Sequence, residues 1–283
     1  MATTAEMREI VGKTFIDARH NPAQANAATA AVLAQAHKDS KPEIETPPDT
    51  HVELDRGIRR DGTWYRTAEV RELTGSDEEA LARAGTNWSR IIDTLITRGV
   101  RTVGNESMTR ALAEELILGD RETLVLAIRR VSFGDSIAYR EVPCPSCGEL
   151  IDVSFPLDQI PVVRLEDPEA DEFTVGLRHG RTAALRLPTG ADQAAVLALK
   201  GEATVAQQNT EMIGRCLLRV EGPDGKAGGS AALARELSMA DRQTIVNFLA
   251  KVQPGPRYQD VSFAHEVCGE EVPLPIGVGD LFR

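Results

Sequence analysis

The sequence predicts an α+β protein made of two similar units in tandem, and three observations lead to this fold class. Turn residues between strand-like stretches predict β-hairpins, one around Asp61 and Gly62 and one within residues 176–187. Apolar residues at helical spacing follow each hairpin. The second half of the chain then repeats the order, and many of the residues, of the first half.

Residues 1–50 differ in composition from the rest of the chain. They are rich in alanine, and the stretch AEMREIVGKTFIDA predicts a short amphipathic helix. The following KPEIETPPDT combines proline with acidic residues, which is typical of an extended, solvated linker. We therefore expect a partly flexible N-terminal segment that ends near residue 50.

The first unit is predicted over residues 51–158. After the hairpin, Ser76 and Glu79 have the spacing of a capping box and predict a helix start. The patterns NWSRIIDTLITRGV and SMTRALAEELILGDRETLVLAIRRV predict further helices, the second of them broken near Gly119. LIDVSF alternates as a strand does and closes the unit.

The second unit, residues 159–283, follows the same order. GLRHGRTAALRL predicts the hairpin, TGADQAAVLA matches TGSDEEALAR of the first unit, and NTEMIGRCLLRV replaces the next helix. From there the offset is 121 residues, and 111–149 share fourteen of thirty-nine residues with 232–270. Ala, Leu and Glu recur by chance in many helices. Chance does not explain why Asp-Arg, a later Gly and Cys-Gly-Glu all recur at this same offset without a gap. The sequence therefore predicts an internal duplication.

The duplication pairs two short motifs that carry metal-ligand side chains. Cys144 and Cys147 lie in CPSCGE, and the same positions 121 residues later are His265 and Cys268, in HEVCGE. Each pair is followed by glycine, where a tight turn can direct backbone N–H groups toward sulfur. Facing each other, the two knuckles supply three thiolates and one imidazole, a set typical of structural zinc. We expect one shared zinc-ribbon-like site that fastens the two units together and loses its metal in acid.

Three other interpretations of these residues stay open. Cys-Pro-x-Cys also occurs in thiol oxidoreductases, but there it begins a helix, and here Gly148 and a strand-like stretch follow. Catalytic zinc needs an open coordination position, which four protein ligands do not leave. The third interpretation is a degenerate knuckle that has lost its metal, with His265 exposed to solvent.

The remaining cysteine and histidines match no ligand spacing. Cys216 aligns with Leu95, an apolar helix position, so we expect a small buried hydrophobic residue there. The other histidines are His20, His37, His51 and His179.

Composition limits the classes of partner. Forty-three acidic residues against 32 basic ones disfavour nucleic acid, and a 4% aromatic content disfavours stacking on bases or sugars. No apolar run approaches the ~18 residues that a membrane span needs, and the first residues do not resemble a signal peptide. We expect a protein of the cytoplasm with no membrane, nucleic-acid or small-molecule partner. No catalytic constellation is recognisable, so no enzymatic activity is expected.

Several motifs together resemble a known family. VRELTGSDEEALAR, LAEELILGDRETLVLAIRRVSFGDSI, VPCPSCGELIDVSF, LRLPTGADQAAVL and the second knuckle are similar to the baseplate hub assembly chaperones named for T-even phages. The resemblance covers roughly residues 52–283, and His265 departs from the two-cysteine form of the second knuckle.

This resemblance implies a non-enzymatic role in building the baseplate or hub of a contractile phage tail or a related injection system. Its partners would be other proteins of the tail cluster, in the cytoplasm of the bacterial host. The alternative is a baseplate subunit that stays in the finished particle. A chaperone needs exposed surface, and the two hairpins, the first with Trp64 and Tyr65, are candidates for it. A zinc-ribbon regulator that binds nucleic acid is a third class, disfavoured by the net charge.

Overall fold

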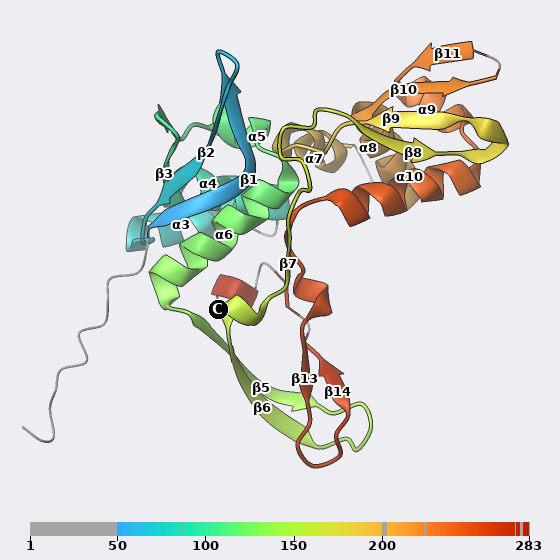
Figure 1. Ribbon diagram of the computed structural model, residues 1–283. Helices are drawn as coiled ribbons and strands as arrows, with labels where there is room; N and C mark the ends of the chain where they lie inside the picture. The colour runs from blue at the N-terminus through green and yellow to red at the C-terminus, as the bar shows by residue number, and fades with distance from the viewer. Residues whose placement is uncertain are drawn as a thin grey trace, which may run out of the picture. The chain divides into compact units, whose positions relative to one another are not determined.

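The computed structural model describes residues 50–85, 87–199, 203–223, 225–274, 276–277 and 280–282. Residues 48–283 form one compact unit with helices and several small antiparallel sheets (Figure 1). The mixed α+β class predicted from the sequence is confirmed. The helix and the flexible segment predicted within residues 1–50 lie outside the described residues, apart from Thr50.

The first sheet is an antiparallel meander in the order β1, β2, β3, β4. Its strands are β1 (His51–Arg60), β2 (Thr63–Val70), β3 (Val100–Val103) and β4 (Glu106–Ser107). The predicted hairpin at Asp61 and Gly62 is confirmed, because Arg60 pairs with Thr63 and both turn residues have positive φ, 50° and 81°. This left-handed backbone matches the twist of the two strands that the turn joins.

Four helices belong to the first half: α3 (Gly75–Ala84) and α4 (Trp88–Gly99) between β2 and β3, then α5 (Arg110–Glu115) and α6 (Leu118–Phe133) after β4. The predicted interruption is present, but it falls at Leu116 and Ile117, whose ψ angles of 140° and 154° are extended. Gly119 itself lies inside α6.

The capping box predicted from Ser76 and Glu79 is wrong. The N-cap of α3 is Thr74, and Asp77 accepts hydrogen bonds from the Thr74 backbone N–H and hydroxyl at 2.9 Å. The side chain of Asp77 is almost completely buried, where the guanidinium of Arg71 holds the pKa of that carboxyl well below its usual range. An aspartate at this position both caps the helix and pairs with arginine, which Glu79 on the exposed helix surface does not do.

The second half has the same order of elements. Its sheet runs β8, β9, β10, β11, and its helices occupy the corresponding places in the chain. The strands are β8 (Phe173–Gly176), β9 (Thr182–Leu185), β10 (Leu217–Gly222) and β11 (Gly225–Gly228), and the helices are α7 (Gly190–Leu197), α8 (Val205–Cys216), α9 (Ala231–Glu236) and α10 (Met239–Val252). The predicted second hairpin is confirmed, because Gly176 pairs with Thr182.

Each half is followed by a two-stranded ribbon. β5 (Ser136–Pro143) pairs with β6 (Leu150–Pro156), and β13 (Ser262–Ala264) pairs with β14 (Glu271–Pro273). A third short pair joins β7 (Val162–Val163) to β12 (Gly255–Pro256), so the connection between the halves runs beside the segment that follows α10.

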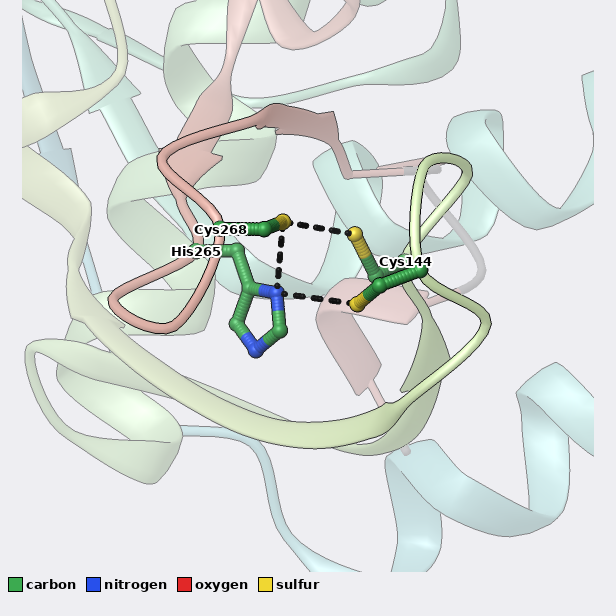
Figure 2. Close-up of side chains that lie close together, drawn as sticks. Cys144, His265 and Cys268 are labelled. Atoms are coloured by element: carbon green, nitrogen blue, oxygen red, sulfur yellow. Dashed lines mark hydrogen bonds between the residues drawn. The ribbon is translucent and has the colours of Figure 1, made fainter.

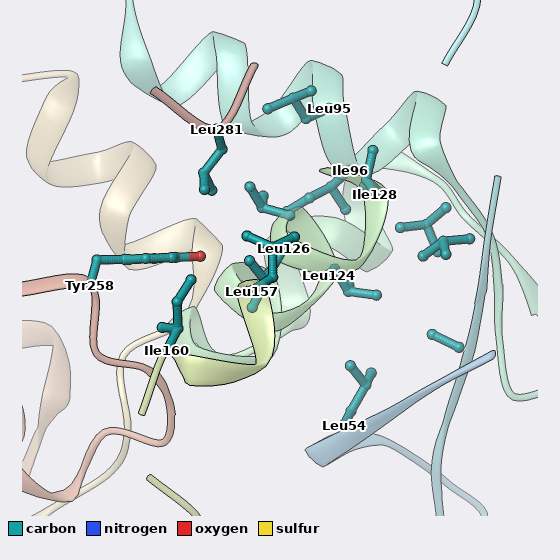
Figure 3. Close-up of a cluster of buried hydrophobic side chains, with 14 of the residues drawn as sticks. Leu54, Leu95, Ile96, Leu124, Leu126, Ile128, Leu157, Ile160, Tyr258 and Leu281 are labelled. Carbon is teal, nitrogen blue, oxygen red and sulfur yellow. The ribbon is translucent and has the colours of Figure 1, made fainter. Parts of the chain in front are cut away.

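The hydrophobic side chains form two clusters. The larger cluster lies around α6 and takes residues from the first sheet, from the connection after β6 and from the far end of the chain (Figure 3). Leu157, Tyr258 and Leu281 are all less than 9% exposed within it. The smaller cluster belongs to the second half and contains Ile213, Cys216 and Ile245. The first half therefore needs residues from beyond the second sheet to complete its core.

An Asp-Arg pair at the start of α6 recurs in α10. Asp120 accepts backbone N–H groups of Asp55, Arg56 and Gly57, with a shortest distance of 2.7 Å to Gly57. Arg121 donates to the carbonyl oxygen of Ala113 at 2.6 Å and to the Asp93 carboxylate at 2.7 Å.

The second half repeats this arrangement with different partners. In the hairpin between β8 and β9, Asp241 accepts hydrogen bonds from the backbone N–H of Arg178 and from the guanidinium of Arg181. Arg242 donates to the Ala234 carbonyl oxygen at 2.6 Å. Arg242 also donates to the hydroxyl of Thr210. Buried charges need such partners, so these side chains fix how each helix pair meets its sheet.

Thr210 takes the place of Asp93, because α4 and α8 have equal length and both lead directly into a strand. By the same match Cys216 corresponds to Gly99, and its predicted alignment with Leu95 is wrong.

Glu122 follows Arg121 on α6 and makes the free energy of unfolding depend on pH. Burial raises its pKa from 4.5 to about 7, against the opposing charge of Arg257. The folded chain therefore keeps this proton up to about pH 7 while the unfolded chain releases it near pH 4.5, so the contribution of Glu122 to stability falls as pH rises through that window.

We expect Glu122→Gln to stabilise the protein above pH 7 by about 2 kcal/mol, at roughly 1.4 kcal/mol per pKa unit with a discount for partial exposure, and to change little near pH 4. Urea unfolding of both chains at the two pH values measures the difference. Glu236→Gln, at an exposed site on α9, is the control. An equal effect of Glu122→Gln at both pH values would contradict the assignment.

Candidate metal centre

The first knuckle is the turn between β5 and β6. The backbone N–H of Cys144 donates to Glu149 O, and that of Gly148 donates to Cys144 O, both at 2.9 Å. Gly148 has φ of 74°, in the left-handed region that glycine adopts without strain. In this turn the backbone N–H groups of Cys147 and Ser146 point at the Cys144 sulfur and lower the pKa of its thiol to about 6.

The second knuckle is the turn between β13 and β14, and it has the same geometry. His265 N–H donates to Glu270 O at 2.8 Å, and Gly269 N–H donates to His265 O at 2.7 Å. Gly269 has φ of 72°, close to the value of Gly148. The two ribbons thus present two equivalent turns, each with a pair of ligand-type side chains three residues apart.

The structure brings the four predicted side chains together. The ligand atoms of Cys144, Cys147, His265 and Cys268 all lie within 4.8 Å of one another. The sulfurs of Cys144 and Cys268 are 3.6 Å apart, and Nδ1 of His265 lies 3.2 Å from Cys268 Sγ and 3.5 Å from Cys147 Sγ (Figure 2). Cys144, Cys147 and Cys268 form no disulfide. The four residues can hold one metal ion.

Glu149 is a residue of this site that the sequence analysis did not single out. Its carboxylate lies 3.5 Å from Nε2 of His265, on the side of the ring away from the sulfurs. A carboxylate in this position fixes the tautomer in which Nδ1 carries the lone pair and can bind a metal. The repeated Cys-Gly-Glu was the available signal, since it places a glutamate two residues after a ligand in each knuckle.

The structure bears on the alternatives for these residues. The Cys-x-x-Cys pair lies in a turn between two strands, so no helix start lowers its thiol pKa as in thiol oxidoreductases. His265 is only 3% exposed, which contradicts an imidazole standing free in solvent. Cys144 is 2% exposed, while Cys147 and Cys268 form the open side of the cluster.

The remaining predicted positions lie elsewhere. Cys216 is completely buried in the smaller hydrophobic cluster, where burial raises its thiol pKa to about 12, as expected for an apolar role. His51 begins β1, and His179 is in an exposed turn with φ of 59°. His20 and His37 lie outside the described residues. None of the described helices is long and apolar enough to cross a membrane.

Trp64 and Tyr65, on the first hairpin, are only partly exposed. The guanidinium groups of Arg56 and Arg59 both lie over the Trp64 ring, at 5.5 and 5.6 Å from its centre. Tyr65 packs against the larger core. These contacts occupy both aromatic side chains within the chain itself, so neither is an open apolar surface.

Fold and site define an α+β protein with two similarly built halves and one shared cluster of three cysteines and a histidine. Residues 56–274 match the model of the T4 bacteriophage base plate protein family, and the chain belongs to that family. No curated protein and no solved structure matches it. Membership implies a structural or assembly role in a phage tail and contact with other baseplate proteins.

Proposed function

We propose that the chain is a non-enzymatic assembly factor for the baseplate or hub of a contractile phage tail or a phage-like injection system. The observation that carries the proposal is the family match across residues 56–274, which spans both halves and both knuckles. The resemblance of the quoted motifs to hub assembly chaperones favours the assembly role over that of a permanent subunit.

The proposed ion is structural zinc. Zn–S bonds of about 2.3 Å at a tetrahedral centre place two sulfurs about 3.8 Å apart, and a sulfur and a nitrogen about 3.5 Å apart. Three of the six separations between the ligand atoms, 3.6, 3.5 and 3.2 Å, lie close to these values, and all six are within 4.8 Å. Three thiolates and an imidazole suit zinc, and four protein ligands leave no position for a substrate. Cys144, Cys147, His265 and Cys268 would hold it, and it would fasten the two ribbons together.

We also propose that the two halves arose by tandem duplication. Matching sheets, helices and knuckles support this, and so do matching polar contacts. Arg121 and Arg242 each bond the carbonyl oxygen eight residues before them. Asp77 and Asp192 each complete a capping box and each pair with two arginines. These contacts recur in the same order along both halves, 115 residues apart at Asp77 and Asp192 and 121 residues apart at Arg121 and Arg242, and copying of one unit leaves such an order behind.

The proposed partners are proteins of the same tail cluster, met in the cytoplasm of the bacterial host. The net charge of −11 favours protein partners over nucleic acid, because counterion release at phosphates needs clustered basic side chains. Binding to membranes or to small-molecule substrates forms no part of the proposal.

The test is where the chain is found when the whole tail cluster is expressed. A tagged chain is expected to retain a baseplate or hub protein from assembly intermediates and to be missing from purified finished particles. Mass spectrometry of both fractions measures this, with the same tag on an unrelated acidic protein as the control. Stoichiometric amounts in finished particles would overturn the assembly role and favour a permanent baseplate subunit.

A further inference from the structure

The two halves of the chain contact each other through two different surfaces. The first surface is the corner between α5 and α6, formed by Leu116–Leu118. The second surface is the start of α7, formed by Pro188–Gly190. Gly190 N–H donates to Leu116 O at 2.9 Å, Leu118 N–H donates to Pro188 O at 3.0 Å, and Ile117 forms a bridge with Thr189.

Close approach at this contact requires a glycine. A Cβ on Gly190 would lie 2.5 Å from Nη1 of Arg121 and 2.8 Å from the Ala113 carbonyl oxygen. Pro188 and Gly190 are accordingly buried. The start of α7 therefore fits against α5 and α6 because it has no side chain at this point.

Because the contact joins unlike surfaces, each half leaves one of the two unused. The second half has its own corner between α9 and α10, formed by Leu237–Met239. The first half has its own helix start, Leu73–Gly75 at α3. An interface between unlike surfaces can be repeated from one molecule to the next, which a contact between like surfaces does not allow.

The second corner is uncovered. Met239 is 88% exposed, whereas its counterpart Leu118 is half-buried against the start of α7. Among the described residues, no hydrogen bond involves the Met239 N–H or the Leu237 carbonyl oxygen, the two groups that match the bonded pair of the first corner. A large apolar side chain and two backbone groups are thus available together.

The start of α3 is uncovered as well. Gly75 is exposed, and a Cβ there would meet nothing within 4 Å. Its φ is not in the left-handed region either, so no local backbone requirement explains a glycine at this first helical position. At the matching position of α7, however, glycine is required by the contact with the other half. Gly75 is therefore a glycine at the same helix position as Gly190, but no other part of the described chain packs against it.

Charge completes the match. Arg121 pairs with Asp93, but Arg242 has Thr210 at that place and forms no ion pair among the described residues. On α7, Gln193 lies beside Leu118 and Arg121 around a small cavity. Its counterpart on α3 is Glu78, an exposed carboxylate that would face Met239 and Arg242 across a copied contact.

We infer that the Leu237–Met239 corner of one chain binds the Leu73–Gly75 helix start of a second copy, head to tail. The contact repeats the one between the halves and adds the pair of Glu78 with Arg242. The contact between copies differs from the internal contact at Ala240, which stands where the first half has Gly119. Gly119 has no room for a Cβ, because a Cβ there would lie 2.1 Å from the Pro254 carbonyl oxygen. The side chain of Ala240 therefore requires a wider separation at this point between two copies. The inference rests on these contacts and not on the proposed function.

The test uses the full chain and two variants, each of which removes one surface. Gly75→Leu adds a side chain where the copied contact has no room, and Met239→Asp puts a charge at the centre of the corner. Both positions are exposed, so the variants are expected to melt with the wild type. Gly228→Leu, at a glycine with equally open surroundings, is the matched control.

Sedimentation over a concentration series is expected to show self-association of the wild type and of Gly228→Leu, and its loss in each of the two interface variants. An equimolar mixture of Gly75→Leu and Met239→Asp is expected to form a dimer, because each chain retains the surface that the other lacks. A wild type that stays monomeric overturns the inference, whether nothing binds the corner or another part of the same chain covers it. So does a mixture that stays monomeric, which would indicate contact between like surfaces.

Discussion

Replacing Cys268 by serine is expected to remove the bound metal and to release the β13–β14 ribbon from β5–β6. Cys268 supplies one of four ligand atoms, and its sulfur lies 3.6 Å from that of Cys144 on the other ribbon. Structural zinc contributes on the order of 10 kcal/mol to the state that binds it. Loss of one ligand is therefore expected to lower the melting temperature by about 10 °C or more, since 1 kcal/mol is worth roughly 2–4 °C at this size.

Metal content per chain, melting temperature and hydrogen exchange of residues 262–273 are the measurements. Val267→Ser is the matched control, because Val267 is 75% exposed in the same turn and is not a ligand. Acidification is expected to act as the Cys268 variant does, because protons compete with the metal for thiolates and imidazole. Equal metal content in Cys268→Ser and the wild type would show that these residues are not the site.

Arg121→Met is expected to destabilise the protein by about 3 kcal/mol, because it leaves a partly buried carboxylate without its cation. The Arg121 side chain is 2% exposed and bridges Asp93 to the Ala113 carbonyl oxygen, while methionine fills similar space without donating. Urea unfolding of the variant measures the loss.

Two further variants separate the ion pair from packing. Arg242→Met, the counterpart in α10, removes hydrogen bonds to neutral groups only and is expected to cost about 1 kcal/mol. Arg110→Met breaks a largely exposed pair with Glu114 and is expected to leave the urea concentration of half-unfolding nearly unchanged. If Arg121→Met unfolds at the same urea concentration as Arg110→Met, the buried pair contributes no more than a surface pair does.

The candidate site could be predicted from the sequence because its second pair of ligands lies at a fixed number of residues from the first pair. Once the register of 121 residues was found, His265 and Cys268 followed from Cys144 and Cys147, and the four ligand atoms are indeed together. The chemistry of each knuckle is local: a glycine with positive φ closes the turn and aims backbone N–H groups at sulfur. Local patterns of this kind are visible in a single sequence.

Other features depended on contacts that the sequence does not display. The spacing of Ser76 and Glu79 fits a helix start, whereas burial of Asp77 beside Arg71 and Arg98 makes Thr74 the N-cap. Ile117 is extended because it pairs with Thr189 in the other half. Propensity and pattern describe the chain locally, and long-range packing overrides them at such points.

The larger hydrophobic core imposes an order on folding. Leu157 packs in that core with Tyr258 and Leu281, which the ribosome adds only after the entire second sheet. During synthesis the first half therefore emerges with part of its apolar surface still uncovered, and this surface stays uncovered until residues 258–281 have been added. The first half of such a chain completes its core only after the second half has been made, and ribosome stalling within the second half would leave an incompletely folded chain open to aggregation or proteolysis.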